Sequence, residues 1–314
     1  AGAVTLGGVI TATVLNQEYQ VLGVTNVNVY TITAKDTAGD TVTANSSDTG
    51  NGGSGVDGDY QINVGLDTEV GGPGWGAGTW GRETWGSASS ISTVTELRIW
   101  SHDNYGEDLL INPRDGGIYY WDSSVGIDDN RAVEIGAISG ASNTPTIAKQ
   151  VMVSDNNRHV IAFGANTINT LVQDPLLIRF SDQENYLNWT PEVTNAAGDL
   201  RIGSGSNFVR ALETKREILI WTDSSLHSMS FLGAPFTFGI QPLSTNITIM
   251  GPNAVVAVND IVLWMGKDSF YIYDGQTKQL PCSVKEEVFF NFNGQQEQKV
   301  YAGVNSEFNE VIWF

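Results

Sequence analysis

Cysteine, basic residues and long apolar runs are all scarce in this sequence of 314 residues. The single cysteine, Cys282, excludes an intrachain disulfide and a zinc site built from cysteines. Only 16 lysines and arginines stand against 35 acidic residues, and the net charge of −19 argues against a surface that binds DNA or anionic lipid tightly. No apolar run reaches the roughly 18 residues of a membrane-spanning helix, and no signal-peptide pattern opens the chain. We therefore expect a soluble protein without a membrane span.

The sequence is rich in glycine, with 35 residues, and contains many short runs rich in Val, Thr and Tyr. This composition predicts an all-β protein with many turns. Residues 1–70 predict a small β-sandwich or barrel-like module, with strands in VITATVL, YQVLGV, VNVYTITAKD, TVTANS and GDYQINVG. The chain starts with Ala and stops in an apparent strand, EVIWF, which is typical of an excerpt from a longer polypeptide.

One glycine-rich segment lies within this module and a second follows it. The first, residues 46–59, predicts a mobile loop; a calcium loop using Asp48, Asp57 and Asp59 is the alternative, although their spacing does not match an EF-hand. The second, residues 71–95, predicts a strap or linker in which Trp75, Trp80 and Trp85 recur every five residues. Because exposed tryptophan is costly in water, we expect these three side chains to dock in grooves of this chain or of a neighbour, with a glycan-binding strip as the alternative.

Residues 96–314 contain a repeated hairpin pattern. In each copy a continuously apolar strand is followed by a polar turn and a second apolar strand, as in DLLINPRDGGIYYWD, RHVIAFGANTINTLV, EILIWTDSSLHSMSF and DIVLWMGKDSFYIYD, with NEVIWF as a shortened fifth copy. Copies begin 43 to 58 residues apart, close to the period of a four-stranded propeller blade. This predicts a β-propeller of five to seven blades, six being favoured, in which the apolar strands are central and buried on both faces. A helical stretch is expected only between Lys285 and Lys299.

One corner of this region, FSDQENYLNWTP, resembles the Asp-box loops of sialidase-type propellers, S-x-D-x-G-x-x-W. Ser181, Asp182 and Trp189 match the pattern, but the spacing is one residue longer and Asn185 replaces the glycine, as a residue that tolerates a left-handed turn. An Asp-box is a structural hairpin corner, so the match predicts a blade corner rather than a catalytic element.

Residues that could carry chemistry are scattered. The carboxylates considered for glycoside hydrolysis are Asp128, Asp129, Asp155, Asp182, Glu184 and Asp223, and the accompanying arginines are Arg114, Arg131, Arg158 and Arg179. No motif selects a pair among them. His102, His159 and His227 lie far apart in the sequence and predict no metal site. We therefore expect no enzyme, no cofactor and no bound metal.

The longer phrases suggest a family. Residues 174–229, together with GPNAVVAVNDIVLWMGKDSFYIYDGQTKQLPC and VYAGVNSEFNEVIWF, resemble the propeller region of the tail nozzle proteins of short-tailed bacteriophages, also called tail tubular protein B, and of the related packaged-DNA stabilisation proteins. The resemblance covers about residues 75–314 and is weaker for the N-terminal module.

The resemblance implies a structural protein of the virion tail without catalytic residues. In that family several copies, usually six, form a ring that closes the DNA channel and conducts the genome during ejection. Expected partners are further copies of the chain in a hexameric ring, adaptor or portal-proximal proteins, tail fibres, and genomic DNA passing without sequence-specific binding. A propeller that binds or degrades host glycans is the alternative function.

Overall fold

The computed structural model describes residues 7–17, 19, 21–26, 29–47, 97, 99–126 and 131–314. The chain divides into two compact units, Ala1–Ile62 and Asn63–Phe314. The described part is nearly all-β, as predicted, and it contains no helix long and apolar enough to cross a membrane. The predicted strap, with Trp75, Trp80 and Trp85, and the candidate calcium ligands Asp57 and Asp59 lie outside the described residues, as does Asp48.

In the first unit the described residues form one helical turn and one antiparallel hairpin, β1 (Val21–Asn26) with β2 (Val29–Ile32). The hairpin agrees with two of the predicted strands. The strand predicted in VITATVL is wrong, because Ala12–Leu15 forms the helical turn α1. The Oγ of Thr11 accepts a hydrogen bond from the backbone N–H of Val14, and this N-cap favours a helix start over an extended chain.

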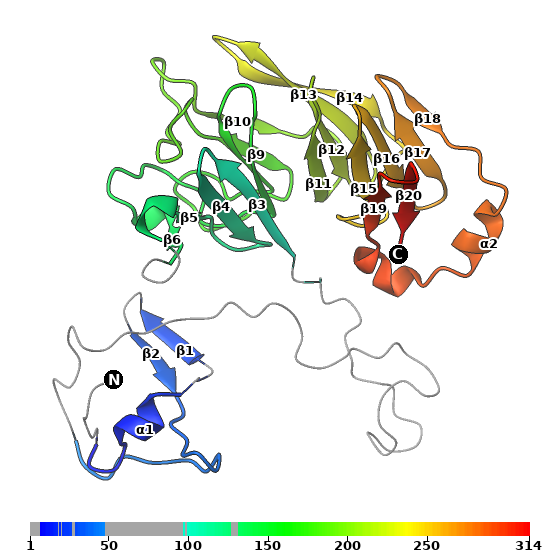
Figure 1. The fold of residues 1–314 in the computed structure, drawn as a ribbon. Coiled ribbons are helices and arrows are strands. Elements are labelled where there is room, and N and C mark those ends of the chain that lie inside the picture. The colour runs from blue at the N-terminus through cyan, green and yellow to red at the C-terminus, as the bar shows by residue number, and fades with distance from the viewer. Residues whose placement is uncertain are drawn as a thin grey trace. The chain divides into compact units, whose positions relative to one another are not determined.

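The second unit consists of consecutive antiparallel meanders, drawn from cyan to red in Figure 1. The first sheet contains β3 (Trp100–Tyr105), β4 (Asp108–Pro113), β5 (Tyr119–Trp121) and β6 (Val133–Glu134). The second contains β7 (Gln150–Val153), β8 (Val160–Phe163), β9 (Leu177–Phe180) and β10 (Gly198–Arg201). The third contains β11 (Phe208–Glu213), β12 (Ile218–Thr222), β13 (Leu226–Gly233) and β14 (Thr237–Ser244). The fourth contains β15 (Val255–Val258), β16 (Ile261–Met265), β17 (Phe270–Tyr273) and β18 (Thr277–Gln279), and the fifth β19 (Ala302–Asn305) and β20 (Glu310–Trp313).

The predicted apolar strands β4, β8, β12 and β16 each occupy the second position of a four-stranded sheet, so they are central strands. β12 shows why such a strand is apolar throughout. Ile218 and Ile220 pack into the core shared with the second sheet, whereas Leu219 and Trp221 pack into the core shared with the fourth. Alternate side chains thus point to opposite faces, and both faces are buried between sheets.

Five sheets among the described residues of the second unit fall within the predicted range of five to seven blades, and the sixth blade that the prediction favoured is not among those residues. Short helical segments, α2 (Lys285–Phe290) and η3 (Gly294–Lys299), connect the fourth and fifth sheets, as expected. Two further short helical turns, η1 (Ser123–Val125) and η2 (Ile135–Ala137), lie in the first-sheet region.

One predicted strand of the second hairpin, INTLV, is wrong. Residues 164–176 form a loop, and the next strand of the sheet is β9. Asn166 is buried there, and its Oδ1 accepts hydrogen bonds from the backbone N–H groups of Thr146 and Ile147 while its Nδ2 donates to the carbonyl of Thr170. These hydrogen bonds stabilise the loop, because a buried side-chain amide needs hydrogen-bond partners and finds them in the loop backbone.

Neighbouring sheets are joined through their first strands, which we call the inner strands. The Oγ of Ser101 on β3 accepts from the N–H of Val151 at 3.0 Å, and Oδ2 of Asp103 accepts from the N–H of Val153 at 2.8 Å. The amide of buried Gln150 pairs with both backbone groups of Ala211 on β11, at 2.8 and 2.9 Å. Side chains of one sheet therefore bond to the backbone edge of the next.

We expect Gln150→Leu to lower the free energy of unfolding by about 2 to 4 kcal/mol, because it leaves the buried N–H and C=O of Ala211 without partners. Urea denaturation measures this. The matched control is Gln276→Leu at an exposed turn, which should change stability by less than about 0.5 kcal/mol. Equal effects of the two substitutions would show that the inner-strand bonds contribute little.

Candidate functional site

The corner that resembles an Asp-box lies between β9 and β10, as predicted, and its polar groups hold the loop. Oδ1 of Asp182 accepts from the backbone N–H groups of Gln183 and Ala196, both at 2.9 Å. Ser181 is buried, and its Oγ accepts from the N–H of Val160 on the neighbouring strand β8. The residue with a left-handed backbone is Glu184, with φ 54°, and not Asn185 as the sequence suggested.

Trp189 is buried at the same corner. It is 1% exposed, and its Nε1 donates to the carbonyl of Tyr186 at 2.8 Å. The guanidinium of Arg179 lies 6.0 Å from the indole ring and bonds to the carbonyls of Asn143 and Asn166. Burial lowers the pKa of Arg179 to about 10. Ser181, Trp189 and Arg179 therefore stabilise the corner instead of facing a substrate.

Of the remaining candidates, the structure brings Arg158 and Glu184 together, because the N–H of Glu184 donates to the carbonyl of Arg158 at 3.1 Å. Arg158 lies over the ring of Tyr105 at 5.2 Å, whereas Arg131 is exposed and Asp128 and Asp129 lie outside the described residues. His159 and His227 are buried in different sheets, with Nδ1 of His159 on the carbonyl of Ser181 and Nε2 of His227 against the Oγ of Ser204. Burial lowers the pKa of both histidines. Within the described ranges, no group of three or more His, Cys, Asp or Glu is placed to hold a metal ion.

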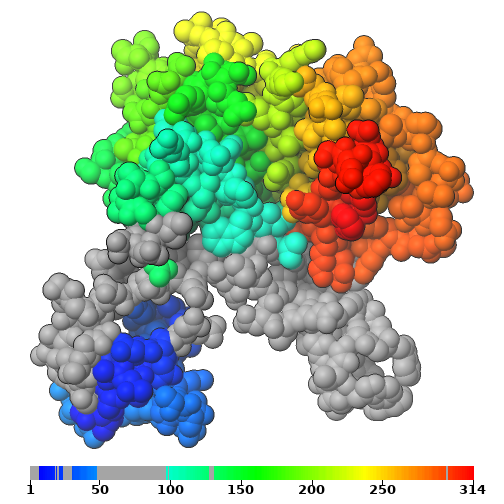
Figure 2. All heavy atoms as spheres, in the orientation of Figure 1, coloured from blue at the N-terminus to red at the C-terminus, as the bar shows by residue number. Residues whose placement is uncertain are grey.

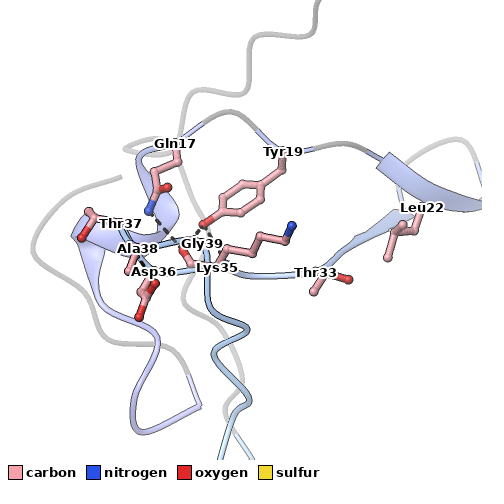
Figure 3. A pocket seen from close by; sticks show the side chains of 9 residues that line it. All are labelled: Gln17, Tyr19, Leu22, Thr33, Lys35, Asp36, Thr37, Ala38 and Gly39. Atoms are coloured by element: carbon pink, nitrogen blue, oxygen red, sulfur yellow. Dashed lines mark hydrogen bonds between the residues drawn. The ribbon is translucent and has the colours of Figure 1, made fainter. Parts of the chain in front are cut away.

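A broad depression of about 510 Å³ lies in the first unit (Figure 3). Its polar side chains serve the local backbone: Nε2 of Gln17 and the hydroxyl of Tyr19 both donate to the carbonyl of Lys35, at 3.1 Å each. Oδ1 of Asp36 accepts from the N–H groups of Ala38 and Asp40. These bonds fix the connection after β2 and leave few groups directed at a ligand.

The second hollow, which we call the central pocket, has a volume of about 120 Å³ and is lined by residues in or next to the first four sheets and by η3, which precedes the fifth. In an antiparallel meander the start of the first strand and the turn between the second and third strands lie at the same end of the sheet. The pocket is lined by residues at those places in successive sheets: Arg114, Lys149, Asn207–Val209, Asp223, Ile249–Pro252, Lys267, Glu297 and Gln298. It therefore sits at one end of the inner strands.

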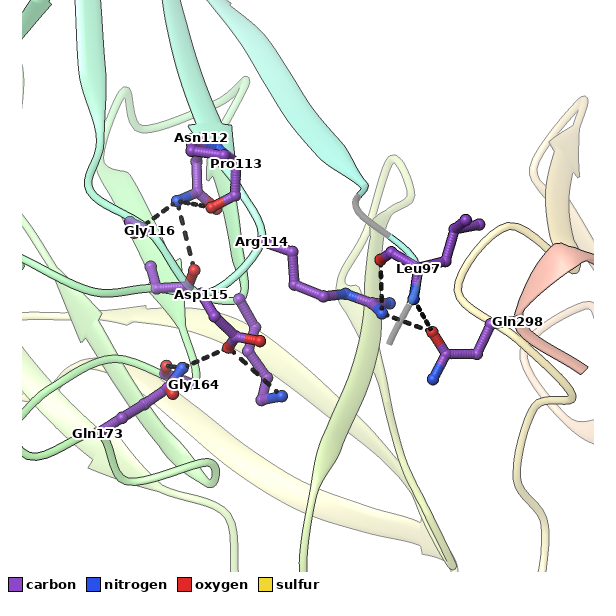
Figure 4. Close-up of polar contacts among 11 residues, drawn as sticks. Leu97, Asn112, Pro113, Arg114, Asp115, Gly116, Gly164, Gln173 and Gln298 are labelled. Atoms are coloured by element: carbon purple, nitrogen blue, oxygen red, sulfur yellow. Dashed lines mark hydrogen bonds and ion pairs between the residues drawn. The ribbon is translucent and has the colours of Figure 1, made fainter. Parts of the chain in front are cut away.

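Polar contacts across the central pocket connect the first sheet to the segment before the fifth (Figure 4). Nη1 of Arg114 donates to Oε1 of Gln298 at 2.8 Å, and the same oxygen accepts from the N–H of Leu97 at 3.1 Å. The other neighbouring sheets are also connected. Inner-strand bonds join the first, second and third sheets, a shared core joins the third and fourth, and β15 contacts β19 of the fifth. Each sheet is thus linked to the next, and the segment before the fifth sheet is linked to the first. The arrangement is propeller-like.

The opposite ends of the inner strands carry acidic groups. Glu213 on β11 accepts from the N–H of Asp155 with both carboxylate oxygens, at 3.1 and 3.3 Å. Burial raises the pKa of Glu213 to about 7, the Asp155 N–H opposes this, and the carboxylates of Asp155 and Asp103 add to it. Burial also raises the pKa of Asp103. Three carboxylates from three sheets thus share one end of the inner strands.

Of the polar residues at the inner strands, Arg114, Asp155 and Asp223 were candidates from the sequence, whereas Asp103, Gln150, Arg210 and Glu213 were not. The only signal for these four was that polar residues interrupt or border short apolar runs, as in FVRALE. Such interruptions also occur on every solvent-facing strand, so the pattern alone could not select them.

Comparison with known proteins adds little to this picture. No family model and no curated protein matches the chain. Solved structures that resemble it include the extracellular domain of BT4673 from B. thetaiotaomicron, described in one structure as a one-component system and in another as a hybrid two-component system. Identity is 14% in both, with TM-scores of 0.41 and 0.40, covering 71% of this chain but 27% of those chains. The chain spans about a quarter of their length, and we base no inference on this likeness.

The raised pKa of Glu213 gives a testable pH dependence. Between about pH 4.5 and 7 the folded chain holds a proton on Glu213 that the unfolded chain releases, so stability falls as pH rises through this window. We expect Glu213→Gln to remove this pH dependence. The free energy of unfolding of the variant minus that of wild type should therefore be larger at pH 8 than at pH 4.5, by on the order of 2 kcal/mol.

Urea denaturation of both proteins at pH 4.5, 6, 7 and 8 measures the difference. Exposed Glu310→Gln serves as the control and should follow the wild-type curve. Parallel curves for wild type and Glu213→Gln would contradict the assignment.

Proposed function

We propose that this chain is a structural subunit of a virion tail, part of the nozzle ring of a short-tailed bacteriophage, with no catalytic role. The resemblance of residues 75–314 to the tail nozzle family motivates the proposal. The structural observation that supports it is that the polar side chains of the inner strands bond to protein backbone. Ser101, Asp103, Gln150 and Glu213 all bond to the backbone of a neighbouring sheet, so they tie the sheets together instead of facing a substrate.

A nozzle subunit must resist deformation while DNA passes. Sheets whose central strands are buried on both faces, and whose inner edges are bonded to their neighbours, form a densely packed block. The net charge of −19 supports the same role, because acidic walls repel the phosphate backbone and let DNA slide without binding.

A ring also needs apolar surface for contacts between subunits. The hairpin of β13 and β14 extends beyond its sheet (Figure 1), and Figure 2 shows its residues in yellow at the margin of the molecule. Phe231, Leu232 and Phe236 near its turn are 43%, 60% and 72% exposed. We assign this hairpin end to the contact with the next subunit in the ring.

The competing function, binding or cleavage of host glycans, gains no support from the described residues. Its sequence motivation was the Asp-box-like corner, and there Asp182 and Trp189 are engaged in holding the loop. The tryptophans of the predicted strap are not among the described residues and leave the binding form of this alternative to experiment.

The proposal is tested by native mass spectrometry of the intact protein, together with imaging of the tails of intact virions. We expect a ring of about six copies around the tail axis. A protein that stays monomeric, is absent from virions, and binds host polysaccharide saturably would overturn the proposal in favour of the glycan alternative.

The subunit contact has its own test. We expect Leu232→Asp to weaken ring assembly by at least tenfold in the concentration of half-assembly, because it places a charge in an apolar contact. Sedimentation at several concentrations measures assembly, and Val193→Asp at a fully exposed loop position is the matched control. Normal assembly of Leu232→Asp would remove the hairpin from the interface.

A further inference from the structure

The central pocket gathers basic groups in a chain that has few of them. Arg114, Lys149 and Lys267 line it, and Arg210 follows the lining residue Val209 on β11. Four of the 16 basic residues of the chain thus lie in this one region. Because the protein as a whole is strongly acidic, this gathering of basic side chains is unusual within the chain, although Asp223 and Glu297 also line the pocket.

Most of the charges around the pocket have partners. Lys149 lies 3.5 Å from the carboxylate of Asp115, and Lys267 lies 3.6 Å from that of Glu297. Asp223 accepts from the backbone N–H groups of Ser206 and Asn207 and from the hydroxyl of Ser206. The acidic groups around the pocket are therefore already bonded to partners from neighbouring segments.

Arg210 differs from the other basic groups, because it has no hydrogen bond or ion pair within the described part of the chain. Its Nε is fully buried and has no partner, although the side chain as a whole is half-buried. Burial lowers its pKa, the nearby Tyr301 opposes this, and the positive charge of Arg114 adds to it. A partly buried guanidinium with an unpaired Nε, close to the positive charge of Arg114, favours a bound anion that balances both charges.

We propose that a small tetrahedral oxyanion such as inorganic phosphate binds at the central pocket, between Arg114, which lines the pocket, and Arg210, which adjoins the lining residue Val209 and interacts with the charge of Arg114. The planar guanidinium donates paired N–H groups that match the oxygen spacing of phosphate. The volume of about 120 Å³ equals that of about four water molecules, which suits a single tetrahedral oxyanion and excludes a DNA groove. A bound anion would bridge the third sheet to the first and complete the bonding at this end.

The first experiment follows the melting temperature of the intact protein as sodium phosphate replaces sodium chloride at constant ionic strength. We expect a saturable rise of about 3 °C at ten times the dissociation constant. Sulfate should act like phosphate and acetate should act more weakly. The absence of a saturable effect of phosphate would overturn the proposal.

Variants identify the site, with the ³¹P line width of inorganic phosphate as a direct readout of binding that does not depend on stability. We expect Arg210→Gln to weaken phosphate binding at least tenfold, whereas Arg216→Gln, at the exposed turn after the same strand, should bind like wild type. Unchanged binding by Arg210→Gln would overturn the assignment.

If Arg210→Gln does not fold, Arg210→Lys takes its place, since it keeps the charge but loses the paired donors. Weaker binding than wild type is then expected, and equal binding would overturn the proposal. A short DNA duplex should fail to displace phosphate; displacement would mean that the site is open to phosphodiesters, against the small-anion form proposed here. None of these outcomes depends on whether the protein forms a ring.

Discussion

The structure depends on satisfying the backbone groups at the inner edge of each sheet. A four-stranded meander leaves unpaired N–H and C=O groups at both edges, and those at the inner edge are costly when buried next to another sheet. Here the neighbouring sheet supplies side chains for the inner edge: Ser101 and Asp103 bond to the edge of β7, and Gln150 bonds to that of β11. The order of the sheets and the burial of their central strands follow from this arrangement.

The same constraint shapes what the molecule can do. Polar groups that in another protein could face a ligand are here directed at the backbone, which leaves a rigid block. One end carries the carboxylates of Asp103, Asp155 and Glu213, and the other carries both basic and acidic groups around the central pocket. A structural role uses the rigidity, and the unpaired guanidinium of Arg210 is the feature that this role leaves unexplained.

Sequence reasoning worked where side-chain pattern and strand geometry are tied together. Four apolar runs were predicted as central strands because a strand buried on both faces cannot alternate with polar residues, and β12 shows this directly. It failed where a local hydrogen bond outweighed the pattern. The N-cap of Thr11 makes a helical turn from a predicted strand, and the side chain of Asn166 holds a loop where a hairpin arm was expected.

The sequence by itself determined the all-β class, the repeat of meanders and the structural nature of the corner at Ser181, because each is encoded in residues near one another in the chain. Only the tertiary structure decided which polar residues meet. Gln150 and Ala211 are 61 residues apart, and Arg114 and Gln298 are 184 apart. No local pattern encodes such pairs, since they arise when consecutive sheets pack side by side and bring their inner strands to a common centre.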